Sequence, residues 1–436
     1  MPSEWLSPTF GELMERGVLE IGDGYRAKND ELGGSGLIFL RAGHVTDTHI
    51  DFDGVERFVT LDTRRFGPKV ACAGDVVVTT KGNSTGRVAF ITGDMPAFVY
   101  SPHLSYWRSK SDVVLNQAFL RAWSRASEFS VQLAAMSRST DMAPYLSLSD
   151  QRRLRITLPP IAVQRRIGEL GDALDERISL LRKTNSTLEA IVQTLFKSWF
   201  VDFDPVRAKA EGREPEDMDT DTATLFPDSF EDSALGEIPK GWRVGDVYDV
   251  AAVRYGAPFA SKLFNAEGDG VPLVRIRDLK DEAPGVWTPE VHPKGYKLQP
   301  GDIVVGMDGE FRAYLWGGDE AWMNQRICVF HPKNGHSSAF VRCSIAAPLA
   351  HVEATETATT VIHLGKGDID RFRILVPSEN VASAFGKISE PLYRRIVAAK
   401  QAIRSLQQLR DTLLPRLISG KLRVPEAEAQ MNEALA

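Results

Sequence analysis

Two loops carry the side chains whose types and spacing could do chemistry. Residues 79–87 (Thr-Thr-Lys-Gly-Asn-Ser-Thr-Gly-Arg) and residues 308–312 (Asp-Gly-Glu-Phe-Arg) each follow an apolar run. Glycine lets a loop backbone approach a phosphate closely, and arginine, asparagine and carboxylate groups match the base edges of DNA. Ordinary hairpin turns use the same residues, so both interpretations stay open. The candidates for DNA contact in these loops are Lys81, Asn83, Ser84, Thr85, Arg87, Asp308 and Arg312.

Further polar side chains in the same two regions could extend such a surface. Most arginine side chains in proteins are simply solvated. Each candidate therefore counts only if the fold gathers it with the others on one face. The first region offers Arg41, His103, Tyr106, Arg108 and Arg138, and the second offers Arg254, Tyr255, Arg275, Arg277, Gln325 and Arg326.

Motifs for catalysis are absent from the sequence. It contains no Gly-x-x-x-x-Gly-Lys-Ser/Thr loop, no Gly-x-Ser-x-Gly elbow and no His-Glu-x-x-His pair. It also lacks the Asn-Pro-Pro-Tyr or Asp-Pro-Pro-Tyr segment that an adenine methylase needs, and its eight histidines show no metal-ligand spacing. We therefore predict no catalytic residue, no metal and no cofactor bound by this chain.

The sequence segments that should position the two loops occur twice in the chain. Such repeats define an architecture more firmly than single motifs do. The landmark pairs are 2–5 with 239–242, 73–78 with 300–305, and 155–159 with 373–377. The offset between the copies shrinks from the first pair to the third and then stays constant, so that Ile178 falls on Ile396. The modules have thus diverged inside, while the segments after them keep one register.

Each module is predicted to be a mixed α/β domain. Short apolar or alternating runs between glycine turns indicate strands, and longer periodic segments indicate helices. Strands are expected at 37–40, 76–80, 88–91, 271–276, 302–307 and 327–330, and helices at 117–125 and 127–136.

A long helix is predicted after each module, because apolar residues recur there at alternating steps of three and four. Asn185 occupies one core position and would fix the register, and Pro415 is expected to end or kink the second helix. We predict that the two helices pair as an antiparallel coiled coil with pseudo-two-fold symmetry; packing of each on its own module is the alternative. The pairing residues are Ile167, Leu174, Ile178, Leu181, Asn185, Leu188, Leu195, Ile388, Leu392, Ile396, Ile403, Leu406 and Leu413.

Composition describes a soluble globular protein of two or three domains. The chain has 436 residues, 43% of them hydrophobic and 25% charged. It has neither a long apolar run nor a secretory signal at its beginning, so a cytoplasmic protein without a membrane partner is expected. Cys72, Cys328 and Cys343 are predicted to be buried.

Net charge neither demands nor excludes a nucleic acid. The formal charge is −6, but residues 211–237 alone hold ten acids and one base. The rest of the chain is therefore slightly basic, which can conceal a basic face.

The predicted boundaries follow from the repeat. Residues 1–155 form the first module, 156–203 the first helix, 204–238 an acidic linker, 239–373 the second module, 374–425 the second helix and 426–436 a tail.

Several segments together resemble the specificity subunits of Type I restriction–modification systems. They are residues 158–167 (Leu-Pro-Pro-Ile-Ala-Val-Gln-Arg-Arg-Ile), 195–203 (Leu-Phe-Lys-Ser-Trp-Phe-Val-Asp-Phe), 225–230 (Leu-Phe-Pro-Asp-Ser-Phe), 237–242 (Glu-Ile-Pro-Lys-Gly-Trp) and 413–422 (Leu-Leu-Pro-Arg-Leu-Ile-Ser-Gly-Lys-Leu). The resemblance covers essentially the full length. Residues 377–380 (Pro-Ser-Glu-Asn) depart from the first joint, which puts the detail of the second joint in doubt.

The resemblance implies that each module is a target recognition domain for one half of a bipartite double-stranded DNA sequence, and that the helices set the unread gap. It also implies two methyltransferase subunits, which bring S-adenosylmethionine, and motor–nuclease restriction subunits, in a bacterial or archaeal phage defence. Two other classes of function stay open: an enzyme with an unrecognised active site, and an assembly scaffold without sequence preference.

Overall fold

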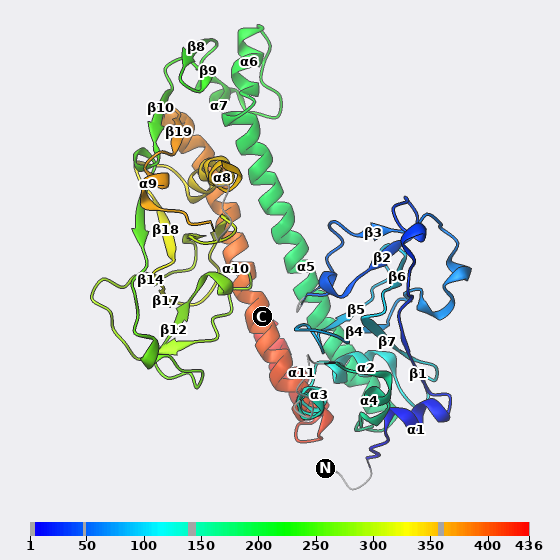
Figure 1. Cartoon of the computed structure of the whole chain (residues 1–436). Coiled ribbons are helices and arrows are strands. Elements are labelled where there is room, and N and C mark those ends of the chain that lie inside the picture. The colour runs from blue at the N-terminus through cyan, green and yellow to red at the C-terminus, as the bar shows by residue number, and fades with distance from the viewer. Residues whose placement is uncertain (1–4, 47–48, 138–144, 356–361, 436) are drawn as a thin grey trace. The chain divides into compact units, whose positions relative to one another are not determined.

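The computed structural model describes residues 5–46, 49–137, 145–355 and 362–435. It divides into two compact units, one of residues 1–178 and 405–436 and the other of residues 179–404. Each of the two long helices, α5 (Ile161–Phe200) and α10 (Glu379–Ile418), contributes one part to each unit. Figure 1 shows both helices as the longest elements of the chain.

Unit 1 contains a four-stranded antiparallel sheet in the order β1-β7-β4-β5 and a second sheet in the order β3-β2-β6, in which β2 and β6 are parallel. Its strands are β1 (Leu19–Asp23), β2 (Ile38–Leu40), β3 (Glu56–Arg57), β4 (Val76–Thr79), β5 (Val88–Phe90), β6 (Phe98–Tyr100) and β7 (Leu104–Ser109). Its further helices are α1 (Phe10–Glu15), α2 (Gln117–Ser124), α3 (Ser127–Ser137), α4 (Leu148–Arg153) and α11 (Val424–Leu435).

Unit 2 repeats this plan. Its sheet β11-β18-β15-β16 is again antiparallel throughout, and a second sheet β13-β12-β17-β14 again contains one parallel pair, β12 with β17. The strands of these sheets are β11 (Ala251–Tyr255), β12 (Val271–Val274), β13 (Trp287–Thr288), β14 (Lys297–Leu298), β15 (Ile303–Gly306), β16 (Ala313–Leu315), β17 (Ala321–Met323) and β18 (Ile327–Pro332). The long helix α8 (Ser338–Thr355) and the short α9 (Lys366–Ile369) follow.

The repeated landmarks of the sequence meet in space. In unit 1, Leu6 pairs with Leu158 and Thr9 with Arg155. In unit 2, the corresponding segments form the antiparallel pair β10 (Arg243–Asp246) and β19 (Arg373–Val376). The segments that open and close each module therefore lie side by side, which explains why both were recognisable at matching places in the sequence.

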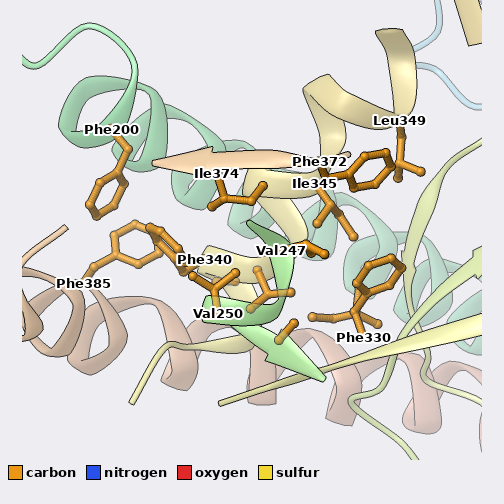
Figure 2. Packing of buried hydrophobic residues seen from close by; sticks show 14 of the residues in the cluster. Phe200, Val247, Val250, Phe330, Phe340, Ile345, Leu349, Phe372, Ile374 and Phe385 are labelled. Carbon is orange, nitrogen blue, oxygen red and sulfur yellow. The ribbon is translucent and has the colours of Figure 1, made fainter. Parts of the chain in front are cut away.

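Apolar alternation places the core on both faces of each four-stranded sheet. Val76 and Val78 of β4 belong to a cluster with Trp107, whereas Val77 between them belongs to another cluster with Tyr106. Strand β15 of unit 2 alternates in the same way. Figure 2 shows part of the main cluster of unit 2, in which the rings of Phe200, Phe340 and Phe385 come from α5, α8 and α10.

The long helices are antiparallel in each unit. In unit 1, Asp175 bonds to Arg410 at 2.6 Å and Gly171 lies beside Leu414, so the numbers rise on one helix as they fall on the other. In unit 2, Asn185 donates to the carbonyl of Ile396 at 3.4 Å, and the rings of Phe196 and Phe385 lie 6.1 Å apart. The predicted antiparallel contact is thus present in both units, while the pseudo-two-fold symmetry stays a prediction.

Some sequence predictions were wrong. Pro415 does not end the second helix, since α10 continues to Ile418; the proline lacks an amide hydrogen and removes one backbone bond of the last turn, and a kink there stays a prediction. Ile388 is 44% exposed, and the adjacent Ser389 takes the buried place beside Ser337. Cys72 is exposed in the turn before β4, whereas Cys328 is buried and Cys343 half-buried.

The acidic segment and the tail contain regular structure that the sequence analysis did not predict. Residues 204–239 include α6 (Asp204–Ala210), α7 (Thr220–Thr224) and the hairpin of β8 (Phe230–Ser233) and β9 (Gly236–Pro239). The described residues of the expected tail, 426–435, belong to α11. Among the described helices, none combines the length and the apolar character that crossing a membrane requires.

Candidate nucleic-acid interface

Backbone hydrogen bonds gather three loops at one end of the sheets of unit 1. The amide of Ser101 donates to the carbonyl of Leu40, and the amide of Thr80 donates to the carbonyl of His103, both at 2.9 Å. The residue after β2, the β4–β5 loop and the β6–β7 turn are therefore neighbours. We call this region the loop edge of unit 1, comprising Arg41, residues 80–87, residues 101–103 and Tyr145, which pairs with Lys81.

Unit 2 has a loop edge of the same construction. The amide of Asn324 donates to the carbonyl of Val274 at 3.1 Å, and the amide of Met307 donates to the carbonyl of Arg326 at 2.9 Å. The loop edge of unit 2 comprises Arg275, residues 307–312, residues 324–326 and His363, which pairs with Asp308. The two edges thus correspond loop by loop, at the positions from which the sequence candidates came.

The residue after the parallel strand has the same role in both units. Arg41 and Arg275 are the N-caps of short 3₁₀ helices, Ala42–His44 and Ile276–Asp278. The guanidinium of Arg41 pairs with Glu56, and Nε of Arg275 pairs with Asp278 at 3.1 Å. Both arginines are therefore held at the loop edge by a neighbouring carboxylate.

The hairpin loops share a turn and differ in their chemistry. Gly82 and Gly309 both have positive φ, 84° and 81°, a conformation that favours glycine. Lys81 and Asn83 are exposed, Ser84 and Arg87 are half-buried, and the hydroxyl of half-buried Thr85 donates to the carbonyl of Gly82 at 2.7 Å. The first loop therefore presents cations and amides at its surface.

Carboxylates are mixed with the cations in the second loop. Nη1 of Arg312 lies 2.5 Å from Oε2 of Glu353 on α8. This hydrogen bond raises the pKa of Arg312 and lowers that of Glu353. Arg326 and Asp308 are 3.7 Å apart, and both contact His363. This loop edge presents paired charges of both signs.

The other candidates of unit 2 differ in place and exposure. Arg254 is exposed on β11, but its guanidinium lies 5.5 Å from the ring centre of Tyr296, whose hydroxyl donates to Asp302 at the end opposite the loop edge. Arg277 and Gln325 are exposed in their turns, whereas Tyr255 is half-buried, and burial raises its pKa. Arg277 and Gln325 are therefore the exposed candidates of this set that adjoin the loop edge.

Two candidates of unit 1 are not brought to the loop edge. Tyr106 is 3% exposed and its hydroxyl donates to Glu20 at 2.9 Å. Arg108 lies toward the opposite end of β7, where it makes two bonds of 2.7 Å to Asp75. These two side chains support the sheet. Arg138 lies outside the described residues.

Sequence reasoning missed Tyr145 and His363. Their positions have the same offset as Ile178 and Ile396 of the long helices, so extending that register backward would have paired them. Within the described residues, no group of three or more His, Cys, Asp and Glu side chains could hold a metal ion.

Comparisons with known proteins agree with this architecture. Residues 239–407 match the model of the Type I restriction modification DNA specificity domain. The chain is 24% identical over 450 aligned residues to the HindI specificity subunit of Haemophilus influenzae, covering 88% of this chain and 94% of that protein. It is 26% identical to the MjaIX specificity subunit of Methanocaldococcus jannaschii, over 65% of this chain and 64% of that protein.

A solved structure shares the fold. The Type I restriction–modification S subunit from M. genitalium superposes with a TM-score of 0.52 at 15% identity, covering 95% of this chain and 96% of that one. Together, the matching domain model over residues 239–407 and a relative aligned over 88% of the chain show that the chain is similar to the specificity subunits of Type I restriction–modification systems.

Proposed function

We propose that the chain reads an asymmetric, bipartite DNA sequence, with one half-site at each loop edge. One observation carries the proposal. The loop edge occurs twice, on sheets with the same strand order, and its side chains differ between the two copies. Equal construction suits two sites of the same kind on one duplex. Unequal side chains suit two different sequences, so the target is not palindromic.

The two edges offer different means of binding DNA. Lys81 and Asn83 of unit 1 can contact phosphates and adenine edges, and Arg326 and Asp308 of unit 2 can contact guanine and cytosine edges. Contacts to phosphates give affinity without sequence information, whereas contacts to bases give specificity. The mixture in each edge is what a sequence-reading surface requires.

The long helices are proposed to hold the two readers at a fixed separation and to carry the partner subunits. A helix of 40 residues is about 60 Å long, and half-sites on one face of a duplex repeat about every 34 Å. We propose that two methyltransferase subunits, which bring S-adenosylmethionine, and the restriction subunits assemble on this chain. Methyl transfer to a base flipped out of the duplex belongs to the partner.

Mapping methylated bases tests the proposal. The chain is co-expressed with its methyltransferase partner in a host that lacks other adenine methylation, and modified adenines are located by sequencing. We expect two unlike half-sites at a constant gap, modified only when this chain is present. A single palindromic site would contradict the assignment of one half-site to each unit. Methyl transfer by the purified chain alone would contradict the non-catalytic role.

A further inference from the structure

A short returning segment late in each module, residues 145–146 and residues 363–364, lies along the hairpin loop. In unit 1, Tyr145 pairs with Lys81, and the amide of the next residue, Leu146, donates to the carbonyl of Thr80 at 2.9 Å. In unit 2, the bridge joins His363 to Asp308, and Leu364 donates to Met307 at 2.8 Å. The returning segment therefore adds a further strand-like piece to each loop edge.

The two returning segments have the same division between anchor and exposed side chain. Leu146 is 1% exposed and Leu364 is fully buried, so these leucines hold the segments in the core. The preceding residues, Tyr145 and His363, are exposed, Tyr145 to 60%. A large aromatic side chain with this exposure contributes little to burial energy. Tyr145 lies beside Lys81 and is open to a ligand at the loop edge.

His363 lies between an acid and a base. Its Nδ1 is 2.7 Å from Oδ1 of Asp308, and Nη1 of Arg326 lies 3.2 Å from the same ring nitrogen. The side chains of Asp308, His363 and Arg326 are 29%, 45% and 54% exposed. With Nδ1–H donating to Asp308, the imidazole holds the carboxylate, and the guanidinium of Arg326 lies beside both, 3.7 Å from Asp308. All three side chains remain accessible.

This pair of charges matches a particular base pair. In the major groove, arginine donates two bonds to O6 and N7 of guanine, and a carboxylate accepts from N4 of cytosine. A carboxylate is repelled by the phosphate backbone, so Asp308 at a DNA surface is best placed against a base donor. A guanine–cytosine pair presents both required groups side by side.

We propose that Tyr145 and His363 occupy equivalent positions at the two loop edges, and that His363 holds Asp308 beside Arg326 for a guanine–cytosine pair in the half-site read by unit 2. The inference rests on the proposed function. It adds the contact residues and one base pair, which the proposed function does not specify. His363 acts through its neighbours and is a positioning residue, whereas Tyr145 contacts the sugar–phosphate backbone or a base directly.

The test uses the full complex with its methyltransferase subunits on the mapped target, at fixed salt. His363→Ala is compared with His351→Ala, another exposed histidine of unit 2, on α8. We expect His363→Ala to reduce discrimination at one guanine–cytosine pair by roughly 5- to 100-fold, and to leave the other half-site unaffected. His351→Ala should change neither half-site. Unaltered discrimination in a folded His363→Ala complex would overturn the proposal.

Two further variants separate its parts. Asp308→Asn replaces a cytosine partner with an adenine partner, so preference at the same position should move toward adenine–thymine. Tyr145→Ala should weaken binding at the unit 1 half-site, with Val131→Ala, 66% exposed on α3, as the control. Binding equal to wild type for Tyr145→Ala would overturn the equivalence of the two positions.

Failure of this inference is distinguishable from failure of the proposed function. If exchange of residues 1–155 moves the methylated sequence but these variants have no effect, the chain reads DNA through other residues. If the exchange leaves the sequence unchanged, the reading role itself is wrong.

Discussion

The two units build the same turn at the start of their central hairpin and complete it differently. Asp75 and Asp302 each accept a bond from the backbone amide three residues earlier, at 2.9 and 2.8 Å. Each also accepts a tyrosine hydroxyl, from Tyr100 at 2.8 Å and Tyr296 at 2.9 Å. The frame of the turn is therefore common to both units.

The side chain opposite the aspartate differs. In unit 1, Arg108 on β7 makes two bonds of 2.7 Å to Asp75. In unit 2, the corresponding place on β18 holds His331, whose Nδ1 is 3.7 Å from Asp302. A turn held by an amide and a hydroxyl tolerates an exchange of its charged partner. At the opposite end of the same strands, the loop edges have diverged further, because they need only present side chains.

The largest effect is expected from removing the aspartate in unit 1. Asp75 is 1% exposed, so Asp75→Ala leaves Arg108 without its partner, at a cost of about 3–5 kcal/mol. Asp302→Ala leaves only neutral donors and a weakly paired histidine without their acceptor, which should lower the free energy of unfolding by about 1–3 kcal/mol. Hydrogen exchange resolved by unit measures both losses. Equal destabilisation of the two units would show that the pairing of Arg108 with Asp75 adds no stability beyond that of the His331 contact with Asp302.

A smaller effect is expected at the hairpin loops. Arg87→Ala and Arg312→Ala should each weaken DNA binding by about 1–3 kcal/mol if the side chain contacts a base, each at its own half-site. Salt-controlled titration of the complex measures this. Arg153→Ala and Arg371→Ala are matched controls, since both arginines are largely exposed and occupy equivalent positions in the repeat. Unchanged binding by both loop variants would remove the hairpins from the interface.

A substitution in the part of α5 that belongs to unit 2 should affect the stability of unit 2 and not that of unit 1. In unit 2, Asn185 is 9% exposed, and its Oδ1 has no hydrogen-bond partner among the described residues. Asn185→Leu should therefore stabilise unit 2 by about 1 kcal/mol, raising its midpoint of thermal unfolding by about 2–4 °C. The protection of unit 1 should not change. A lower midpoint would mean that the amide is needed for register.

The smallest predicted effect is a difference in pH dependence. Burial lowers the pKa of both His331 and His336 in unit 2. The folded unit thus resists protonation, and stability present above about pH 6.5 is lost as the pH falls below it. Burial raises the pKa of Glu128 in unit 1, which favours that fold at lower pH.

Hydrogen exchange at pH 7.5 and 5.5 should therefore show a larger loss of protection in unit 2. His331→Arg gives unit 2 the cation type of unit 1 and should reduce the difference. A larger acid effect on unit 1 would contradict the assignment.

The sequence predicted the strands and the long helices better than the candidate contact residues. The landmark at 73–78 falls on β4 and its copy on β15, and the apolar periodicity located both long helices, because burial leaves a regular trace in sequence. The exposure of a polar side chain leaves no such periodic pattern in the sequence. Tyr106 and Arg108 could not be separated from surface residues, because β7 lies between β1 and β4 and is covered on both faces.

Tyr145 and His363 were missed for a related reason. Each is a single exposed residue that pairs with a loop distant in the sequence, at Lys81 in one unit and at Asp308 in the other. The constant offset of the repeat pairs them with each other but cannot show what lies beside them. Pairings over such distances in sequence are decided by the whole fold and leave no local pattern.

Exchange of one module tests the central claim most directly. Residues 1–155 are replaced by the corresponding module of another specificity subunit, and methylated adenines are mapped in the assembled system. We predict that one half-site changes, while the other half-site and the gap stay the same. A methylated sequence that does not change would contradict the assignment of the modules as readers of DNA.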